Sequence, residues 1–485
     1  MNHRFLTPAL EELTASAEYY ESQSLGRKIS QRGDTIPCRL VTNRPNHFPP
    51  LVKYHSTNNP AHQVDLKEAI LRSLPPDNGL YMPNTLPVLG ADFWGKWRDL
   101  SFSEIGFAVA DAFFGEDVPE EKLREIVDGT LAFDAPIVTL APGDHILELF
   151  HGPTLAFKDF GARFMARLMA YLTRGENREL TVLVATSGDT GGAVASAFHK
   201  VPGTRVIILY PKGKVSGLQE KQLTALGGNI TALEIEGTFD DCQALVKKAF
   251  LEREVAERMN LTSANSINLS RLVPQSFYYI HSARQLTDGI EPVFVVPSGN
   301  FGNLTAGLLA KQLGLPVRHF VAATNRNDVV PTYLETGTYT PRPSVATISN
   351  AMDVGAPSNF VRMSALFGNS WDKFRGCVSG MSFTDEETRV AIREAKALHG
   401  YKVCPHTAVG WLAAKRWHAA HPGSSTITLA TAHPAKFPDV MDAELGVGAV
   451  EIPERLAILA DKEKVATNLP KDWEPFRDWL AAHIT

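Results

Sequence analysis

Lys158 is the residue of this chain whose surroundings most suggest covalent chemistry. It lies in the stretch HGPTLAFKDFGARF, between Phe157 and Phe160 and directly before Asp159. Burial disfavours a charged ammonium group and lowers its pKa, which leaves an amine able to attack a carbonyl group. The other interpretation is a lysine at a helix start, whose stem packs while its head reaches water. The segment alone favours this second interpretation.

A glycine-rich turn, TSGDTGG at 186–192, follows the apolar run LTVLVAT and precedes a helical pattern. Its small residues let a ligand approach the backbone, and the next helix offers unpaired N–H groups. The hydroxyls of Thr186, Ser187 and Thr190 add further donors. Such a turn suits a carboxylate or a phosphate, although a turn of this composition between a strand and a helix needs no ligand.

A second turn, SGNFGN at 298–303, also joins an apolar run to a helical pattern. Its two Gly-Asn pairs can present several N–H groups to one phosphate. It has neither the P-loop nor the dinucleotide-binding spacing of glycines, so a smaller phosphorylated cofactor is a better candidate than a nucleotide.

Two further segments hold polar residues that suit an anion. Thr431, in ATAHPAKF, follows an apolar run and could point its hydroxyl into the same cleft, although a plain loop explains it equally well. Ser266 and Arg271, in NSINLSRLVPQ, offer a hydroxyl and a guanidinium for a substrate phosphate, and a surface arginine is the alternative. A phosphate site beside an activated lysine indicates a Schiff base with pyridoxal phosphate.

Strands that alternate with helices must position these residues. Nearly all-apolar runs occur at 180–186, 204–210, 291–298, 317–324 and 425–431, and 93–133 has the pattern of helices. Buried strands of this kind indicate an α/β fold whose parallel sheets are covered on both faces. Ligands bind such sheets at the carboxyl ends of the strands, where the glycine-rich turns lie.

The bulk composition is that of a large globular protein. The chain has 485 residues, which favours two or three domains or one large unit with an appendage. Its net charge of −5 gives no reason to expect a nucleic acid or an anionic membrane as partner. No apolar run approaches the roughly 20 residues of a spanning helix. The cysteines form no Cys-x-x-Cys pair and the N-terminus lacks a secretory core, which favours the cytoplasm and no metal site.

Several long segments resemble the threonine synthase family in its longer bacterial and fungal form, and they occur in the family's order. They are HGPTLAFKDFGARFMARLM, ATSGDTGGAVASAF, KGKVSGLQEKQLTALGGNI, GTFDDCQALVK, NSINLSRL, VPSGNFGN, NAMDVGAPSNF and LATAHPAKFPDV. The match runs from about Lys53 to about Ala443, most of the chain.

The resemblance implies the fold of the tryptophan synthase β-subunit group, in which pyridoxal 5'-phosphate lies between two α/β domains of a fold-type II enzyme. We therefore expect a helical N-terminal region over 52–145 and a smaller α/β domain over 146–260 with the Schiff-base lysine and the SGDTGG loop. A larger α/β domain with the phosphate cup is expected over 261–485.

The resemblance also implies the roles of individual residues, with Lys158 as the Schiff-base and catalytic residue. The implied cofactor-binding residues are Asp189, Gly299, Asn300, Phe301, Gly302, Asn303 and Thr431. The implied substrate-binding residues are Ser187, Thr190, Ser266 and Arg271, with Asn300 as a further candidate for the substrate phosphate. Many relatives in the fold group carry Asn at the position of Asp189, which leaves its contact with the cofactor hydroxyl open. Asp159 has no implied role beyond an anion at a helix start, and Phe157 and Phe160 are expected to form an apolar wall around the amine.

The implied reaction converts O-phospho-L-homoserine and water to L-threonine and phosphate. The nearest alternative is a phospho-lyase that acts on phosphothreonine or phosphoserine by β-elimination, and a cysteate synthase would use phosphoserine and sulfite. A non-catalytic binder of pyridoxal phosphate is a further alternative, against which the intact Lys158 and phosphate cup argue. The oligomeric state, monomer or homodimer, stays open.

Residues 1–51 differ from the rest of the chain, with clusters such as TNRPNHFPP that break any periodicity. The resemblance starts at VKYHSTNNP, where relatives begin with Met-Lys-Tyr, so Val52 stands at the position of a start codon. We expect 1–51 to be a loosely packed extension that results from an over-long gene reading.

Overall fold

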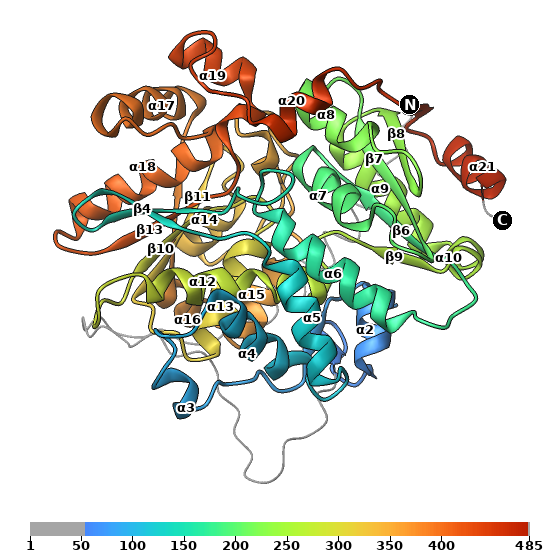
Figure 1. Ribbon diagram of the computed structural model, residues 1–485, viewed down its shortest axis with the longest axis horizontal. Coiled ribbons are helices and arrows are strands. Elements are labelled where there is room, and N and C mark those ends of the chain that lie inside the picture. Colours follow the sequence, from blue (N-terminus) through green and yellow to red (C-terminus); the bar gives the residue numbers. More distant parts are fainter. Residues whose placement is uncertain (1–53, 484–485) are drawn as a thin grey trace, which may run out of the picture.

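Three sheets and the helices packed on them make up residues 54–483, the part of the chain that the computed structural model describes (Figure 1). The extension expected over 1–51 lies outside these residues. The smallest sheet has the order β2-β1-β3 and consists of β1 (Tyr54–Ser56), β2 (Gln63–Val64) and β3 (Tyr81–Pro83).

The larger sheet is six-stranded, with the order β12-β11-β10-β13-β5-β4. Its strands are β4 (Ile137–Ala141), β5 (Asp144–Glu148), β10 (Val293–Pro297), β11 (His319–Thr324), β12 (Val378–Ser382) and β13 (Thr426–Ala430). All neighbours are parallel except β4 and β5, which pair antiparallel. The smaller sheet is five-stranded and wholly parallel, with the order β14-β8-β7-β6-β9. Its strands are β6 (Leu180–Ala185), β7 (Thr204–Pro211), β8 (Ile230–Glu236), β9 (Leu261–Ser263) and β14 (Thr467–Pro470).

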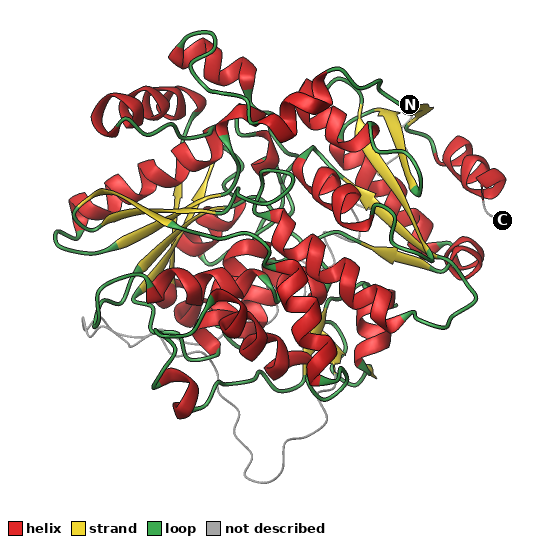
Figure 2. Ribbon diagram, viewed as in Figure 1, coloured by secondary structure: helices red, strands yellow, loops and turns green. Residues whose placement is uncertain are grey.

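Helices pack on both sheets (Figure 2). Those beside the larger sheet include α12 (Gln275–Arg284), α13 (Gly302–Gln312), α14 (Val329–Thr336) and α18 (Pro405–Ala420). Those beside the smaller sheet include α7 (Asp189–Phe198), α8 (Gly217–Thr224), α9 (Phe239–Leu251) and α21 (Trp473–His483). The remaining helices after α6 (Lys158–Leu172) are α10 (Arg253–Met259), α11 (Leu269–Leu272), α15 (Phe360–Leu366), α16 (Trp371–Cys377), α17 (Asp385–His399), α19 (Pro438–Leu445) and α20 (Glu454–Ala460), with short 3₁₀ turns at Asn350–Met352 and Pro434–Lys436.

All five strands predicted from apolar runs are confirmed, as β6, β7, β10, β11 and β13, and they are parallel as expected. Other strands carry weaker signals. For example, β12 reads VSGMS and is mostly half-buried, and β14 reads TNLP with two exposed residues. Apolar periodicity identifies a strand that is buried on both faces, and it misses edge strands such as these two.

Sheet membership crosses the predicted domain ranges. From the range 261–485, β9 and β14 join the smaller sheet, and the hairpin of β4 and β5 near the boundary at 146 joins the larger one. Strand pairing depends on contacts between distant segments, which composition and periodicity do not encode. The strands of the two larger sheets are therefore interleaved along the chain. The domain ranges themselves remain a prediction.

The helices expected over 93–133 are present as α3 (Ala91–Trp94), α4 (Phe102–Phe114) and α5 (Glu120–Thr130), and α2 (Leu66–Arg72) precedes them. A capping box fixes the start of α4, because the Ser101 hydroxyl accepts from the N–H of Glu104 while the Glu104 carboxylate accepts from the N–H of Ser101. α4 packs on α12, and α5 packs on α6 (Lys158–Leu172).

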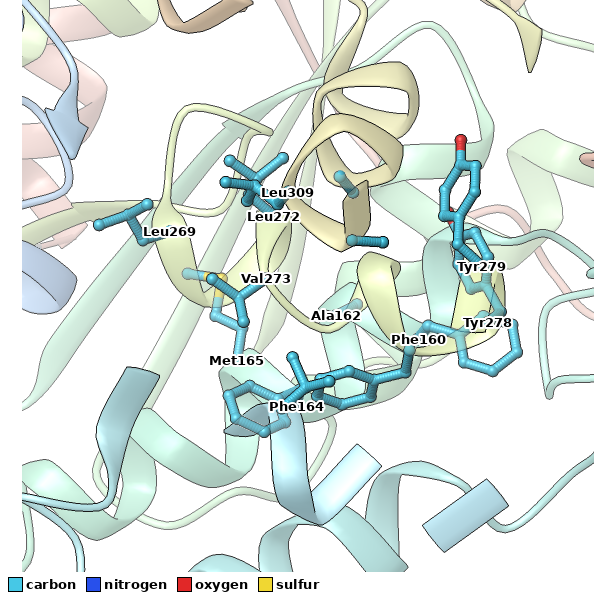
Figure 3. Close-up of a cluster of buried hydrophobic side chains, with 14 of the residues drawn as sticks. Phe160, Ala162, Phe164, Met165, Leu269, Leu272, Val273, Tyr278, Tyr279 and Leu309 are labelled. Atoms are coloured by element: carbon cyan, nitrogen blue, oxygen red, sulfur yellow. The ribbon is translucent and has the colours of Figure 1, made fainter. Parts of the chain in front are cut away.

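α6 carries the reactive-lysine candidate and is held by an aromatic core (Figure 3). Phe160 and Phe164 are fully buried, and the Phe160 ring meets Tyr278 edge-on at a centroid distance of 5.2 Å. The expectation that Phe160 forms a wall around the amine is therefore wrong, because its side chain packs into the core beneath the helix. This packing fixes the first turn of α6, and with it the backbone of Lys158.

None of the helices between residues 54 and 483 is long and apolar enough to cross a membrane. Over the same residues, no group of three or more histidine, cysteine or acidic side chains could hold a metal ion.

Candidate active site

One pocket lies where the carboxyl ends of β6, β10 and β13 approach one another between the two sheets. Its wall includes Thr186 after β6, Ser298 after β10 and Thr431 after β13. This is the position at which parallel sheets bind ligands. All the site residues predicted from sequence line this pocket: Lys158, Ser187, Asp189, Thr190, Ser266, Arg271, Gly299, Asn300, Phe301, Gly302, Asn303 and Thr431.

Lys158 is the first residue of α6 and lies on the pocket wall. The preceding residue, Phe157, donates its N–H to the carbonyl of Thr431 at 2.9 Å, which ties the helix start to the end of β13. The Lys158 Nζ lies 5.8 Å from the Phe157 ring centroid, so the expected apolar neighbour is present on this side. Burial lowers the pKa of Lys158 to about 8; the Asp189 carboxylate opposes this change, and the charge of Arg271 adds to it. The amine is thus partly neutral near pH 8.

Asp159 anchors the loop that leads into α6. Its two carboxylate oxygens accept from the Thr154 N–H at 2.8 Å and from the Thr154 hydroxyl at 2.7 Å. The loop packs closely here, since a Cβ on Gly152 would lie 2.4 Å from the Asp159 carboxylate. Burial raises the pKa of Asp159, and the two bonds from Thr154 oppose that rise. The role left open by the sequence is therefore structural, because Asp159 holds the backbone that precedes Lys158.

The site holds a second lysine, Lys436, which is fully buried and was not predicted from the sequence. Its Nζ lies 2.6 Å from Oδ1 of Asp189, and neither side chain is more than 4% exposed. Lys436 also donates to the carbonyl of Thr154 at 2.7 Å, and Gln219 donates to the same Asp189 oxygen at 2.8 Å. The sequence did contain a signal for its burial, because in AHPAKF Lys436 has apolar neighbours as Lys158 does.

Asp189 is held as a carboxylate by this pairing. Burial alone would raise its pKa, but the charges of Lys436 and Lys158 outweigh burial and hold the pKa well below its usual range. Asp189 lies in the first turn of α7, which follows β6 of the smaller sheet, whereas Lys436 follows β13 of the larger sheet. The ion pair therefore joins the two sheets at the pocket.

The turn at 298–303 forms a close-fitting cradle. Phe301 has a left-handed backbone (φ 58°) and directly precedes α13, whose first N–H groups have no partner within the helix. A Cβ on Gly299 would lie 2.7 Å from Cα of Met352, so no larger residue fits there. The Asn303 side chain is buried, and its Oδ1 accepts from the hydroxyls of Tyr278 and Tyr279. Its Nδ2 has no partner among residues 54–483 and remains as a donor.

Arg271 contributes a buried cation to the same wall. It is 2% exposed, and its Nη1 donates to the Ala264 carbonyl at 2.5 Å. Its buried Nε has no partner within the described part of the chain. Burial lowers the pKa of Arg271 to about 10, which leaves it charged at neutral pH. Together with Lys436 and Lys158, it makes the pocket favourable for anions.

His406, which the sequence analysis also missed, supports the cradle from behind. It lines the pocket at the start of α18, and its Nε2 accepts from the N–H of Ala351 at 3.2 Å. Burial lowers the pKa of His406 to about 4, so the ring is neutral. It fixes the segment that lies against Gly299. Sequence patterns give no signal for a contact between residues 55 positions apart.

Three family models match the chain. The model described as "Pyridoxal-phosphate dependent enzyme" matches residues 146–431, which is more than half of the chain. Models described as "Threonine synthase N terminus" and "Threonine synthase, C-terminal" match residues 53–131 and 407–479.

Characterised relatives and solved structures agree with these matches. The chain is 43% identical to the threonine synthase of Escherichia coli over 89% of its own length and 100% of that protein, and 36% identical to that of Saccharomyces cerevisiae over 81% and 89%. The crystal structure of the Escherichia coli enzyme superposes with a TM-score of 0.84 and covers 89% of this chain and 100% of its own. The pyridoxal-phosphate-bound threonine synthase of Brucella melitensis, 36% identical, has a TM-score of 0.82 and covers 89% and 99%. These matches confirm the expected fold-type II architecture.

The buried ion pair of Lys436 with Asp189 predicts that loss of the lysine destabilises the fold. In a Lys436→Met variant the Asp189 carboxylate stays buried without its main counter-charge, so we expect the free energy of unfolding to fall by about 3–5 kcal/mol. The Lys212→Met variant, which breaks an exposed pair with Glu236, should cost about 0–1 kcal/mol. Denaturant titration of both variants measures the difference. A loss for Lys436→Met no larger than that of the control would contradict the assigned pairing.

The lowered pKa of Lys158 predicts how the free energy of unfolding of the cofactor-free protein depends on pH. Below about pH 8 the lysine binds a proton in both the folded and unfolded states, so it adds no slope to stability. Between about pH 8 and pH 10 only the unfolded state holds that proton, so stability rises by up to about 1.4 kcal/mol per pH unit. The difference in unfolding free energy between wild type and Lys158→Met isolates this slope. A flat difference over that range would contradict a lowered pKa.

Proposed function

This chain belongs to the threonine synthase family of pyridoxal-phosphate dependent enzymes, and from that premise we propose that it converts O-phospho-L-homoserine and water to L-threonine and phosphate. The observation that carries the proposal is the meeting of Lys158 with two anion-binding turns on one pocket wall. The lysine provides the amine that the cofactor requires, and the turns provide places for a phosphate and a carboxylate.

The residues present fit pyridoxal 5'-phosphate. Lys158 offers a half-buried side chain whose amine has a lowered pKa, which suits the aldehyde of the cofactor. The cradle of Gly299, Phe301 and Gly302 offers backbone N–H groups at the start of α13, and Gly299 has no room for a side chain. The Nδ2 of Asn303, which has no partner among residues 54–483, is a donor that a phosphate would satisfy. We propose that Asn300 belongs to this cradle. When bound, the cofactor supplies an electron sink that lets a proton leave the substrate α carbon.

Two side chains on opposite walls would face the cofactor ring. Thr431 presents a neutral hydroxyl, and we propose that it faces the ring nitrogen and leaves that nitrogen largely unprotonated. Asp189 presents the carboxylate that Lys436 and Gln219 hold at Oδ1. Its second oxygen is thereby oriented as an acceptor, which suits a hydroxyl donor on the ring.

The substrate would be held at its two charged ends. Ser187 and Thr190 lie at the start of α7 after β6, where hydroxyls and unpaired N–H groups suit the substrate carboxylate. Ser266 and Arg271 suit the substrate phosphate, because the guanidinium stays charged and its Nε has no partner among residues 54–483. Two fixed ends would hold the carbon chain of the substrate beside the Lys158 amine.

Lys158 would move the protons of the reaction. Its Nζ, when free and neutral, takes the proton from the α carbon and later a proton from the β carbon. A pKa near the working pH suits a group that must both accept and return protons. Phosphate leaves from the γ carbon, the oxygen of water ends on the β carbon, and the returned protons complete L-threonine. The phosphate site fixes the geometry in which the γ carbon loses its leaving group.

The test is product analysis with purified holoenzyme and O-phospho-L-homoserine. We expect equal amounts of L-threonine and phosphate from wild type and from Lys415→Ala, which changes an exposed lysine. The Lys158→Ala variant should lose the visible absorbance of the bound cofactor and lose phosphate release by more than about a hundredfold, the scale of one acid–base group. A 2-oxo acid and ammonia in place of threonine would instead identify a phospho-lyase.

We also propose that the enzyme works in the cytoplasm on this small-molecule substrate, without nucleic acid or membrane partners, as a monomer or homodimer. The near-neutral overall charge supports the absence of an anionic polymer partner.

A further inference from the structure

The hydroxyl of Ser266 receives two hydrogen bonds from side-chain amides. Its Oγ lies 2.8 Å from Nδ2 of Asn300 and 3.1 Å from Nδ2 of Asn359. Asn359 is fully buried, and Ser266 and Asn300 are half-buried on the pocket wall. The three residues come from segments 34 and 93 positions apart, so the tertiary fold alone brings them together.

The orientation of both amides follows from groups that can only donate. The Oδ1 of Asn300 accepts from the backbone N–H of Ser358 at 2.5 Å, and the Oδ1 of Asn359 accepts from Nη1 of Arg362 at 3.0 Å. A backbone N–H and a guanidinium have no acceptor capacity, so an amide oxygen must face each of them. The amide NH₂ groups must therefore both point at Ser266, and that of Asn359 also donates to the backbone carbonyl of Asn300 at 3.1 Å.

A serine hydroxyl has two acceptor positions and one proton. The amides of Asn300 and Asn359 fill both acceptor positions of Ser266, so this hydroxyl can interact with a ligand only as a donor. No acceptor among residues 54–483 takes its proton, and the side chain lines the pocket. A hydroxyl fixed in this way selects a ligand group that accepts, such as a phosphate monoester dianion.

Arg362 supports this arrangement from within the protein. It is 0% exposed, and its acceptors are all neutral: Asn359 Oδ1 and the carbonyls of Ser266, Ile267 and Tyr81. No carboxylate of the described chain pairs with it. Burial lowers the pKa of Arg362 to about 9, so it is charged at neutral pH. An unbalanced buried cation is costly, and an anion on the far side of Ser266 and Asn359 would offset part of that cost.

We propose that Asn359 and Arg362 are positioning residues that act through Ser266 and fit the pocket to the phosphate monoester of the substrate. Arg362 orients the Asn359 amide, the amide makes the Ser266 hydroxyl a donor only, and the hydroxyl binds the phosphate. This inference rests on the proposed function for the identity of the phosphate-bearing substrate, and the hydrogen-bond relay itself rests on the contacts above.

An Asn359→Asp variant tests the relay in the holoenzyme. The new carboxylate accepts where the amide donated, so it captures the Ser266 proton and repels a phosphate. We expect the inhibition constant for inorganic phosphate and the KM for O-phospho-L-homoserine to rise about 10- to 100-fold, the worth of a hydrogen bond to a charged group. The kcat should change by less than about threefold. The cofactor dissociation constant, measured by visible absorbance, should stay within the same limit. Of the residues assigned to the cradle, Asn359 bonds to the Asn300 carbonyl alone, and a carbonyl oxygen does not bind a phosphate.

The matched control is Asn369→Asp, the same change on an exposed asparagine, which should leave all four quantities at wild-type values. A double-mutant cycle of Ser266→Ala with Asn359→Ala isolates the coupling. The Asn359 change should weaken phosphate binding at least about fivefold when Ser266 is intact, and less than about twofold in the Ser266→Ala background. An Arg362→Lys variant keeps the charge but cannot reach all four acceptors, and it should raise KM in the same direction.

Three results would overturn the proposal. One is a folded Asn359→Asp protein whose KM and phosphate inhibition stay within about twofold of the control, the usual limit of additivity between uncoupled sites. Another is a double-mutant cycle in which the effects of Ser266→Ala and Asn359→Ala on phosphate binding simply add. A third is a loss of cofactor affinity with unchanged KM, which would assign the relay to the cofactor phosphate. If wild type binds inorganic phosphate in titration calorimetry, loses it in Asn359→Asp and yet makes no threonine, the relay stands and the proposed function fails.

Discussion

Excess positive charge, buried between the two sheets, is the constraint on which the rest of the site depends. Lys158, Lys436, Arg271 and Arg362 are cations at or behind the pocket wall, whereas the buried carboxylates there are Asp189 and Asp159. Taking charges out of water costs several kcal/mol per ion unless a partner compensates. The direct ion pair of Lys436 with Asp189 compensates one cation. Lys158 and Arg271 line a pocket that suits anionic ligands, and Arg362 lies behind it with neutral acceptors.

The architecture places this charge where ligands enter. Parallel strands of both sheets end at the pocket, so the starts of α7 and α13 add unpaired N–H groups to the same wall. Asp159 and Thr154 fix the loop before Lys158, and Lys436 ties that loop to Asp189. Because these contacts cross from one sheet to the other, any change in the separation of the sheets would move the amine relative to the phosphate cradle.

Local patterns, together with the resemblance to a known family, were enough to predict residues that line the pocket. Lys158 has apolar neighbours, and the turns at 186–192 and 298–303 carry their glycines in a short run after apolar strands, so each is visible within a few positions. The supporting residues were not visible, because His406, Asn359 and Arg362 act through contacts with segments 55 to 281 positions away. The prediction for Phe160 was wrong for a related reason, since an apolar residue next to Lys158 in the sequence can face the core as well as the pocket.

Two lysines, Lys158 and Lys436, lie at the site, and the proposed chemistry requires that Lys158 is the one that reacts. Lys436 is paired with a carboxylate at 2.6 Å, whereas Lys158 has a lowered pKa and no direct carboxylate bond within the described residues. The most direct measurement is reduction of the holoenzyme with borohydride, followed by proteolysis and mass spectrometry. The assignment of Lys158 as the reacting lysine predicts the reduced cofactor on the peptide that contains Lys158. The same mass on the peptide that contains Lys436, or on neither, would contradict it.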